Sequence, residues 1–165
     1  MNKITCALSV LALAIAPTLA LAGPGGTSCA TAEVLAAGGT YSGDTSNAAY
    51  SNVVGGFGPL PSPAADSIYT FTAVSGVNGN ITVTAAGFNF GIFLESACAA
   101  AAPPPINAAT GPSAPQSMSL AGVAAGTQYW VIVSGNPSDA SAPEGTYTFT
   151  TPTPLPVSLQ SFSID

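Results

Sequence analysis

The sequence predicts an all-β fold, a single antiparallel β-sandwich of seven or eight short strands that follows a cleaved signal peptide. Short segments alternate apolar and polar side chains, which is the pattern of strands buried on one face. These segments are rich in Thr, Val, Tyr and Phe, which favour strands. The chain also holds 18 glycines and 15 prolines, many of them between these segments, as expected of turns in a sandwich.

Residues 126–135 form the expected central strand, because they hold the only tryptophan within the densest run of aromatic and β-branched residues. Alternation along this strand places apolar side chains on both faces, with Tyr129, Val131 and Val133 on one and Trp130 and Ile132 on the other. Neither face can be left in water without exposing apolar area. Each side of this strand therefore needs a covering layer.

The remaining elements are predicted from alternation, turn residues and prolines. Before the central strand we expect two short strands around a turn in residues 32–45, a surface loop at 50–65, and a hairpin of strands 66–73 and 81–85 with an Asn-Gly turn. A strand at 88–94, a Pro-rich crossing loop at 99–115 and a strand at 117–123 follow. After the central strand, residues 145–150 are expected to pair with that strand as a closing hairpin.

Residues 1–22 have the properties of a bacterial secretory signal peptide. Lys3 precedes an apolar run, and small residues at Ala20 and Ala22 predict cleavage after Ala22. An uncleaved membrane anchor is the alternative, but the run is short for a span and no positive cluster follows it. We therefore expect a secreted or periplasmic protein.

Two further parts follow the signal peptide. Residues 23–151 are expected to form the sandwich domain, which is long enough to bury a core of its own. Residues 152–165 begin as a Pro-rich spacer and end as an alternating apolar segment. That segment is either an edge strand of the sandwich or a stub that another chain or a sorting system recognises.

The charge balance excludes several classes of partner. The chain has seven acidic residues and one basic residue, Lys3, which leaves with the signal peptide. A chain without cations cannot replace the counterions of a phosphate backbone, and it has no attraction to anionic lipid. We therefore expect no nucleic acid and no membrane among its partners, and an extracellular polysaccharide or protein instead.

Two cysteines, Cys29 and Cys98, remain after cleavage. An even count in an exported chain favours one disulfide, with two free thiols as the alternative. Closing a loop of about seventy residues would stabilise the fold by roughly 4 kcal/mol. Two cysteines without histidine supply too few soft ligands for a zinc site.

Catalysis is not expected. Without His or Lys after the signal peptide, serine and cysteine nucleophiles lack their usual base. Two carboxylates can still serve a glycosidase or an aspartic protease, and Asp44 and Asp66 are each followed by a hydroxyl residue. Neither has the glycine of the aspartic protease element, so we interpret both as turn residues.

Two binding hypotheses remain. Calcium takes oxygen ligands, and the candidates are Asn136, Asp139 and Glu144 in one loop together with Asp44 and Asp66. The alternative is that these side chains form a solvated acidic loop. Tyr129 and Trp130 point to opposite faces, so one of them can be exposed as a stacking platform for a sugar or peptide, with burial of both as the alternative.

The order of several short motifs is similar to that of the bacterial pre-peptidase C-terminal domain. The matching motifs, within residues 29–150, are Cys29-Ala30-Thr31-Ala32, Gly43-Asp44-Thr45, Asp66-Ser67-Ile68-Tyr69-Thr70-Phe71, a strand ending at Cys98, and Gly126 to Val133 with Gly145-Thr146-Tyr147. The resemblance implies a jelly-roll-like sandwich that accompanies secreted proteases, some members binding collagen or calcium. This chain carries no peptidase domain, and Ser67 stands where many members have a second acidic residue.

Two functions follow as hypotheses. The first is a non-catalytic secreted accessory or binding domain that contacts an extracellular polymer or protein. The second is a structural, matrix or adhesin-like subunit that self-associates by adding its C-terminal segment to a neighbour's sheet edge.

Overall fold

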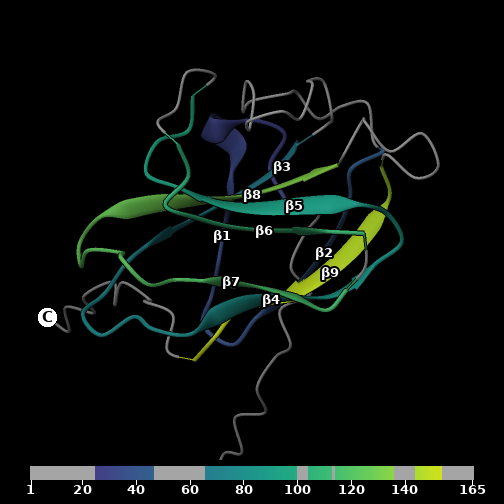
Figure 1. The fold of residues 1–165 in the computed structure, drawn as a ribbon. Coiled ribbons are helices and arrows are strands. Elements are labelled where there is room, and N and C mark those ends of the chain that lie inside the picture. The colour runs from purple at the N-terminus through teal and green to yellow at the C-terminus, as the bar shows by residue number, and fades with distance from the viewer. Residues whose placement is uncertain (1–24, 47–65, 100–103, 113, 136–143, 154–165) are drawn as a thin grey trace, which may run out of the picture.

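Two β-sheets packed face to face form the molecule (Figure 1). The structure is a computed structural model that describes residues 25–46, 66–99, 104–112, 114–135 and 144–153. The predicted signal peptide, the expected loop at 50–65 and most of the C-terminal segment lie outside these described residues. The predicted β-sandwich is confirmed.

Nine strands and one short 3-10 helix lie within the described residues. In chain order they are η1 (Cys29–Thr31), β1 (Glu33–Val34), β2 (Thr40–Asp44), β3 (Asp66–Thr72), β4 (Asn80–Ala86), β5 (Phe90–Glu95), β6 (Asn107–Gly111), β7 (Gln116–Ser119), β8 (Gln128–Gly135) and β9 (Thr146–Thr150). The prediction of seven or eight strands omitted β6 and counted the others.

The strand order is that of a jelly roll. One sheet has the order β1-β3-β8-β5-β6 and the other has the order β2-β9-β4-β7, so the predicted central strand, β8, is the middle strand of five. From β2 onward each strand lies in the opposite sheet from the one before it, except that β5 and β6 are neighbours. Every pairing is antiparallel apart from the short parallel contact of β1 with β3.

Both predicted hairpins are wrong, for the same reason. Strands β3 and β4 are consecutive, but β3 pairs with β8 whereas β4 pairs with β7 and β9. Likewise β9 does not close on β8 but pairs with β2 and β4. Short loops with Gly and Asn are compatible with a hairpin turn and with a crossing between layers, so the local sequence does not distinguish them.

The expectation of a loop throughout residues 99–115 is also wrong. Residues Asn107–Gly111 form β6, which pairs with β5 from Leu94 opposite Asn107 to Phe90 opposite Gly111. The segment is Asn-Ala-Ala-Thr-Gly, which has little intrinsic strand preference. Its strand conformation therefore depends on the hydrogen bonds that the edge of β5 offers.

The inner faces of the two sheets form one aromatic core. Tyr69 of β3 lies edge-on to Phe149 of β9, with ring centroids 5.0 Å apart, and the Tyr69 and Tyr147 hydroxyls are 2.7 Å apart. The predicted face of residues 88–94 is confirmed, because its alternate side chains are all in the core: Phe88, Phe90, Ile92 and Leu94. The strand itself begins two residues later than predicted, at Phe90.

At one end of the sandwich lie the strand ends that are joined by four connections. These connections join β2 to β3, β4 to β5, β6 to β7 and β8 to β9, because successive strands run in opposite directions through the layers. Three of the predicted calcium ligands, Asp44, Asp66 and Glu144, border this end of the sandwich, whereas Asn136 and Asp139 lie outside the described residues. The opposite end carries the turns 73–79 and 120–127, together with the connection between β5 and β6.

Candidate functional site

The outer face of the four-stranded sheet is covered with hydroxyl groups. In each of its strands a buried apolar residue alternates with a polar one, as in β9, where Tyr147 and Phe149 are buried between three threonines. The outward side chains are Thr40, Ser42 and Asp44 in β2, Thr146, Thr148 and Thr150 in β9, Asn80, Thr82 and Thr84 in β4, and Ser117 and Ser119 in β7. Apart from Asp44, this face is uncharged.

Register aligns these hydroxyls in rows across the sheet. Thr40 lies opposite Thr150, Thr150 opposite Thr82, and Thr82 opposite Ser117, so one row crosses all four strands. Neighbours along a row hydrogen-bond to each other, with 2.9 Å between the Ser42 and Thr148 hydroxyls and 3.0 Å between those of Thr82 and Ser117. We call this surface the hydroxyl face.

A broad hollow of about 750 Å³ lies at one end of the hydroxyl face. Its lining comes from β2, β4, β9 and the β6–β7 connection: Ser42, Gly43, Asp44, Thr84, Ala86, Gly87, Ala114, Thr146, Tyr147 and Thr148. Gly43 is required beneath it, because a Cβ at this position would collide with the Tyr147 hydroxyl. The hollow therefore combines small residues with hydroxyl groups.

Asp44 supplies the negative charge at the hollow. Its Oδ1 accepts hydrogen bonds from the Ser46 hydroxyl, at 2.5 Å, and from the Ser46 backbone N–H, at 2.9 Å. These bonds stabilise the carboxylate, the side-chain bond most, and lower the pKa of Asp44 below its usual value. The geometry is that of a turn-capping Asp, and the carboxylate is ionised at neutral pH.

The other proposed calcium ligands are only partly described. Glu144 is exposed just before β9, and Asp66 is buried at the start of β3 with 1% of its surface accessible. Asn136 and Asp139 lie outside the described residues, in the connection from β8 to β9. Within the described residues no three acidic, cysteine or histidine side chains gather as a metal site would require. Calcium binding stays a prediction.

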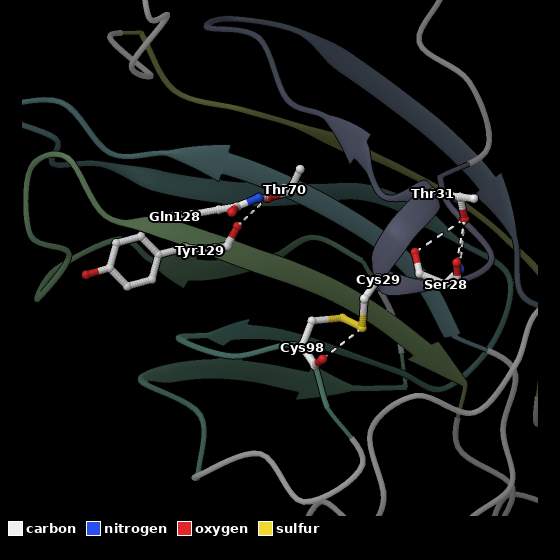
Figure 2. The surroundings of a disulfide bond; sticks show 7 residues. All are labelled: Ser28, Cys29, Thr31, Thr70, Cys98, Gln128 and Tyr129. Carbon is white, nitrogen blue, oxygen red and sulfur yellow. Dashed lines mark hydrogen bonds between the residues drawn. A yellow bond between two sulfur atoms is a disulfide. The ribbon is translucent and has the colours of Figure 1, made fainter.

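Cys29 and Cys98 form a disulfide, with an S–S distance of 2.09 Å (Figure 2). Cys29 opens η1, in which the hydroxyls of Ser28 and Thr31 are 2.9 Å apart. The Cys29 sulfur also lies 2.9 Å from the Cys98 carbonyl oxygen, a close contact without a hydrogen to share. The predicted pairing is present in the structure.

The two aromatic candidates have different environments. Tyr129 is buried in the core, its ring 5.8 Å from that of Phe71, and its hydroxyl accepts a hydrogen bond from the Ala124 backbone N–H at 2.8 Å. The Tyr129 ring is therefore enclosed and presents no platform. Trp130 is half-buried on the outer face of the five-stranded sheet, and its indole nitrogen has no hydrogen-bond partner in the described structure.

Glu95 was not among the predicted site residues. It is the last residue of β5, lies opposite Trp130, and has no accessible surface. Neither of its carboxyl oxygens has a hydrogen-bond partner among the described residues, and burial raises its pKa to about 7. The sequence signal was available, because alternation from Phe93 places Glu95 on the same sheet face as a buried aromatic residue.

No protein-family model, curated protein or solved structure matches this chain. The resemblance to the pre-peptidase C-terminal domain therefore stays a prediction from the order of short motifs. Among the described residues, no helix is long and apolar enough to cross a membrane.

Proposed function

We propose that this chain is a secreted, non-catalytic binding module that holds a neutral extracellular polysaccharide on its hydroxyl face. The observation that carries the proposal is the row of Thr40, Thr150, Thr82 and Ser117 across all four strands. Hydroxyl groups both donate and accept hydrogen bonds, so a regular array of them is complementary to the hydroxyls of a sugar chain. An extended row suits an extended polymer better than a small ligand.

Charge supports a neutral ligand. The hydroxyl face carries one carboxylate, Asp44, and no basic residue follows Lys3 in the chain. An anionic glycan would find no partner for its charges and would be repelled at the hollow. A neutral polymer is not repelled by the Asp44 carboxylate, and it can form water-mediated contacts to that group.

The non-catalytic part of the proposal rests on chemistry. Among the described residues that line the hollow, Asp44 and the buried Tyr147 are the ionisable ones. Asp44 has a lowered pKa and therefore holds no proton for a general acid at neutral pH. A glycosidase needs two carboxyl groups with different protonation states on either side of the bond to be cleaved. In the part of the chain that the structure describes, Asp44 alone contributes a carboxylate to the hollow.

Co-sedimentation with insoluble polymers tests the proposal. The purified protein is mixed with cellulose, chitin, peptidoglycan or collagen, each with calcium and with chelator. We expect saturable pelleting with a neutral polysaccharide, and about tenfold weaker binding for the double variant Thr82→Val and Thr148→Val, which removes two outward hydroxyls but keeps the side-chain shape. The matched control is Thr72→Val, an exposed strand threonine of the other sheet.

Two outcomes would contradict the proposal. Binding to none of the polysaccharides is one, and equal binding by the double variant and the wild type is the other. Pelleting with collagen alone would favour a protein ligand, and loss of pelleting with chelator would implicate calcium. The alternative function, assembly through residues 152–165, would instead appear as oligomers that are lost when residues 154–165 are deleted.

A further inference from the structure

The outer face of the five-stranded sheet holds a carboxyl group in an environment that does not suit its charged form. Glu95 has no accessible surface and its two oxygens have no partner in the described structure. A buried carboxylate is normally paired with a cation or with several hydrogen-bond donors, because its desolvation is costly. This side chain has neither.

No basic side chain after Lys3 is available as the missing partner. Lys3, in the signal peptide, is the only basic residue of the sequence. On the strands near Glu95, the ionisable side chains that share its sheet or border it are Glu33 of β1 and Asp66 of β3, both acidic, while β6 carries none and Tyr129 of β8 points to the core. None of these side chains supplies a positive charge that would stabilise the Glu95 carboxylate.

Glu95 also lies at a junction of the fold. It ends β5, and Cys98 follows three residues later, tethered to Cys29 in η1. The segment before η1 is anchored on the far side of the sheet, where the Gly26 N–H bonds the Ile68 carbonyl of β3 at 2.8 Å. Since β8 lies between β3 and β5, this tethered segment passes β8 on the outer side, where Figure 1 shows η1. We call η1, Cys98 and the end of β5 the disulfide corner.

Trp130 is the second group with an unmet requirement at this place. It lies between Thr70 of β3 and Glu95 of β5 in the register of the sheet. The hydroxyl of Thr70 is already committed, since it donates to the Tyr129 carbonyl and accepts from the Gln128 amide, both at 2.9 Å (Figure 2). The indole N–H of Trp130 is buried without a partner in the described structure. Water at the disulfide corner would satisfy both orphan groups.

We propose that Glu95 acts as a proton-dependent latch of the disulfide corner. With its proton in place the neutral carboxyl group fits the enclosed site beside Trp130, and the corner is closed. When the proton is lost, the carboxylate requires solvation, and the corner opens to admit water onto Trp130 and the end of β5. The cysteine tether limits the opening to this corner, so the sandwich core stays folded.

Trp130 reports on the latch directly, because it is the only tryptophan in the chain. In the wild-type protein we expect its emission to shift to the red and its quenching by acrylamide to rise at least twofold between pH 5 and pH 8.5. The midpoint should lie near pH 7, where Glu95 loses its proton. The single indole N–H signal in a ¹⁵N NMR spectrum should move over the same range.

Substitutions separate the latch from general pH effects. Glu95→Gln keeps the shape without the titration and should abolish the transition, and Glu95→Leu is the second variant if the first fails to fold. Glu144→Gln removes an exposed carboxyl group and should leave the transition unchanged. Far-UV circular dichroism establishes that each variant is folded at both pH values.

Three results would overturn the proposal. Constant emission and quenching of the wild type from pH 5 to pH 8.5 would show that no latch opens. A transition that persists in both Glu95 variants would assign it to another group. An emission change without a gain in quenching would mean that the carboxylate is accommodated in a closed corner.

Discussion

The two outer faces of this sandwich have opposite chemistry although both belong to strands with similar alternation. The hydroxyl face of the four-stranded sheet presents Thr and Ser to solvent, with Ser42 exposed on its edge strand β2. The outer face of the five-stranded sheet holds Ile68, Ile132 and Phe93 in one cross-strand row, each at most 3% exposed. One face is available to a ligand, whereas the other is a second, smaller core.

The difference separates an open face, on which we propose that the ligand binds, from a covered face whose buried side chains contribute to stability. Removing an atom from the covered face leaves a cavity or an unsatisfied group, while removing a hydroxyl from the open face exchanges one contact for water. The covered face also accounts for the unusual position of Glu95, since a carboxyl group at the equivalent place on the hydroxyl face would be hydrated. The following predictions test this contrast, in order of decreasing effect.

Removing the disulfide should give the largest loss. The double variant Cys29→Ser and Cys98→Ser opens a loop of 69 residues and should lower the free energy of unfolding by about 4 kcal/mol. Urea unfolding followed by circular dichroism measures it, and reduction of the wild type should give a similar loss. An unchanged urea midpoint would mean that the disulfide does not contribute to the stability of the covered face.

Paired substitutions compare the two faces directly. Ile132→Ala removes a side chain with no accessible surface and should destabilise the protein by about 3 kcal/mol. Thr148→Ala, at the centre of the hydroxyl face, removes the hydroxyl that bonds to Ser42. Because water can replace this bond, the free energy of unfolding should change by at most about 0.5 kcal/mol. Equal losses in urea unfolding would contradict the distinction between a covered and an open face.

Stability should fall as pH rises through neutrality. The unfolded chain has Glu95 ionised above its ordinary pKa of 4.5, whereas the folded protein keeps the proton until about pH 7, so the unfolded state binds fewer protons between these values. From pH 5 to pH 8.5 the folding equilibrium constant should fall about 75-fold, which corresponds to about 2.6 kcal/mol. Urea unfolding at both values measures it.

Glu95→Gln is the control for this pH dependence. The variant should show a nearly flat stability between pH 5 and pH 8.5, because Asp44, with its lowered pKa, titrates below this range. A wild-type stability that rises with pH would show that a different group dominates.

The floor of the hollow is tested by two glycine substitutions with different expected effects on stability. Gly43→Ala places a methyl group against the Tyr147 hydroxyl, which is bonded to that of Tyr69, and should cost about 2 kcal/mol. Gly87→Ala lines the same hollow, but nothing lies within 4 Å of its new Cβ, so it should be nearly neutral. Equal shifts of the thermal unfolding midpoint for both variants would show that close packing of Tyr147 against Gly43 does not contribute to stability.

Much of the fold was predictable, and the limits have a physical cause. The alternation in residues 66–72 and 128–135 fixes which side chains face the core, because the period of a strand is two whatever it pairs with. Partner choice is different, since the same turn suits a hairpin and a crossing, and the two expected hairpins were wrong for this reason. The strand at Asn107–Gly111 was missed because it depends on a neighbour that the local sequence does not specify.

The candidate site divides in the same way. The threonines of β9 and β4 were visible in the sequence as polar positions, but only the register of the sheet aligns them with Thr40 and Ser117 in one row. The acidic residues were all identified from the sequence, yet Glu95 differs from Glu144 only by its surroundings: one is fully enclosed and the other is exposed.

By itself, the sequence determined the all-β class, the identity of the central strand, the cysteine pair and a chain without basic side chains after Lys3. These depend on residue type and on short spacings, which persist in any arrangement of the strands. The tertiary structure decided which strands are neighbours, which outer face is covered and what surrounds Glu95. Those properties depend on contacts between residues far apart in the chain, where loop closure and packing of the whole core outweigh local preference.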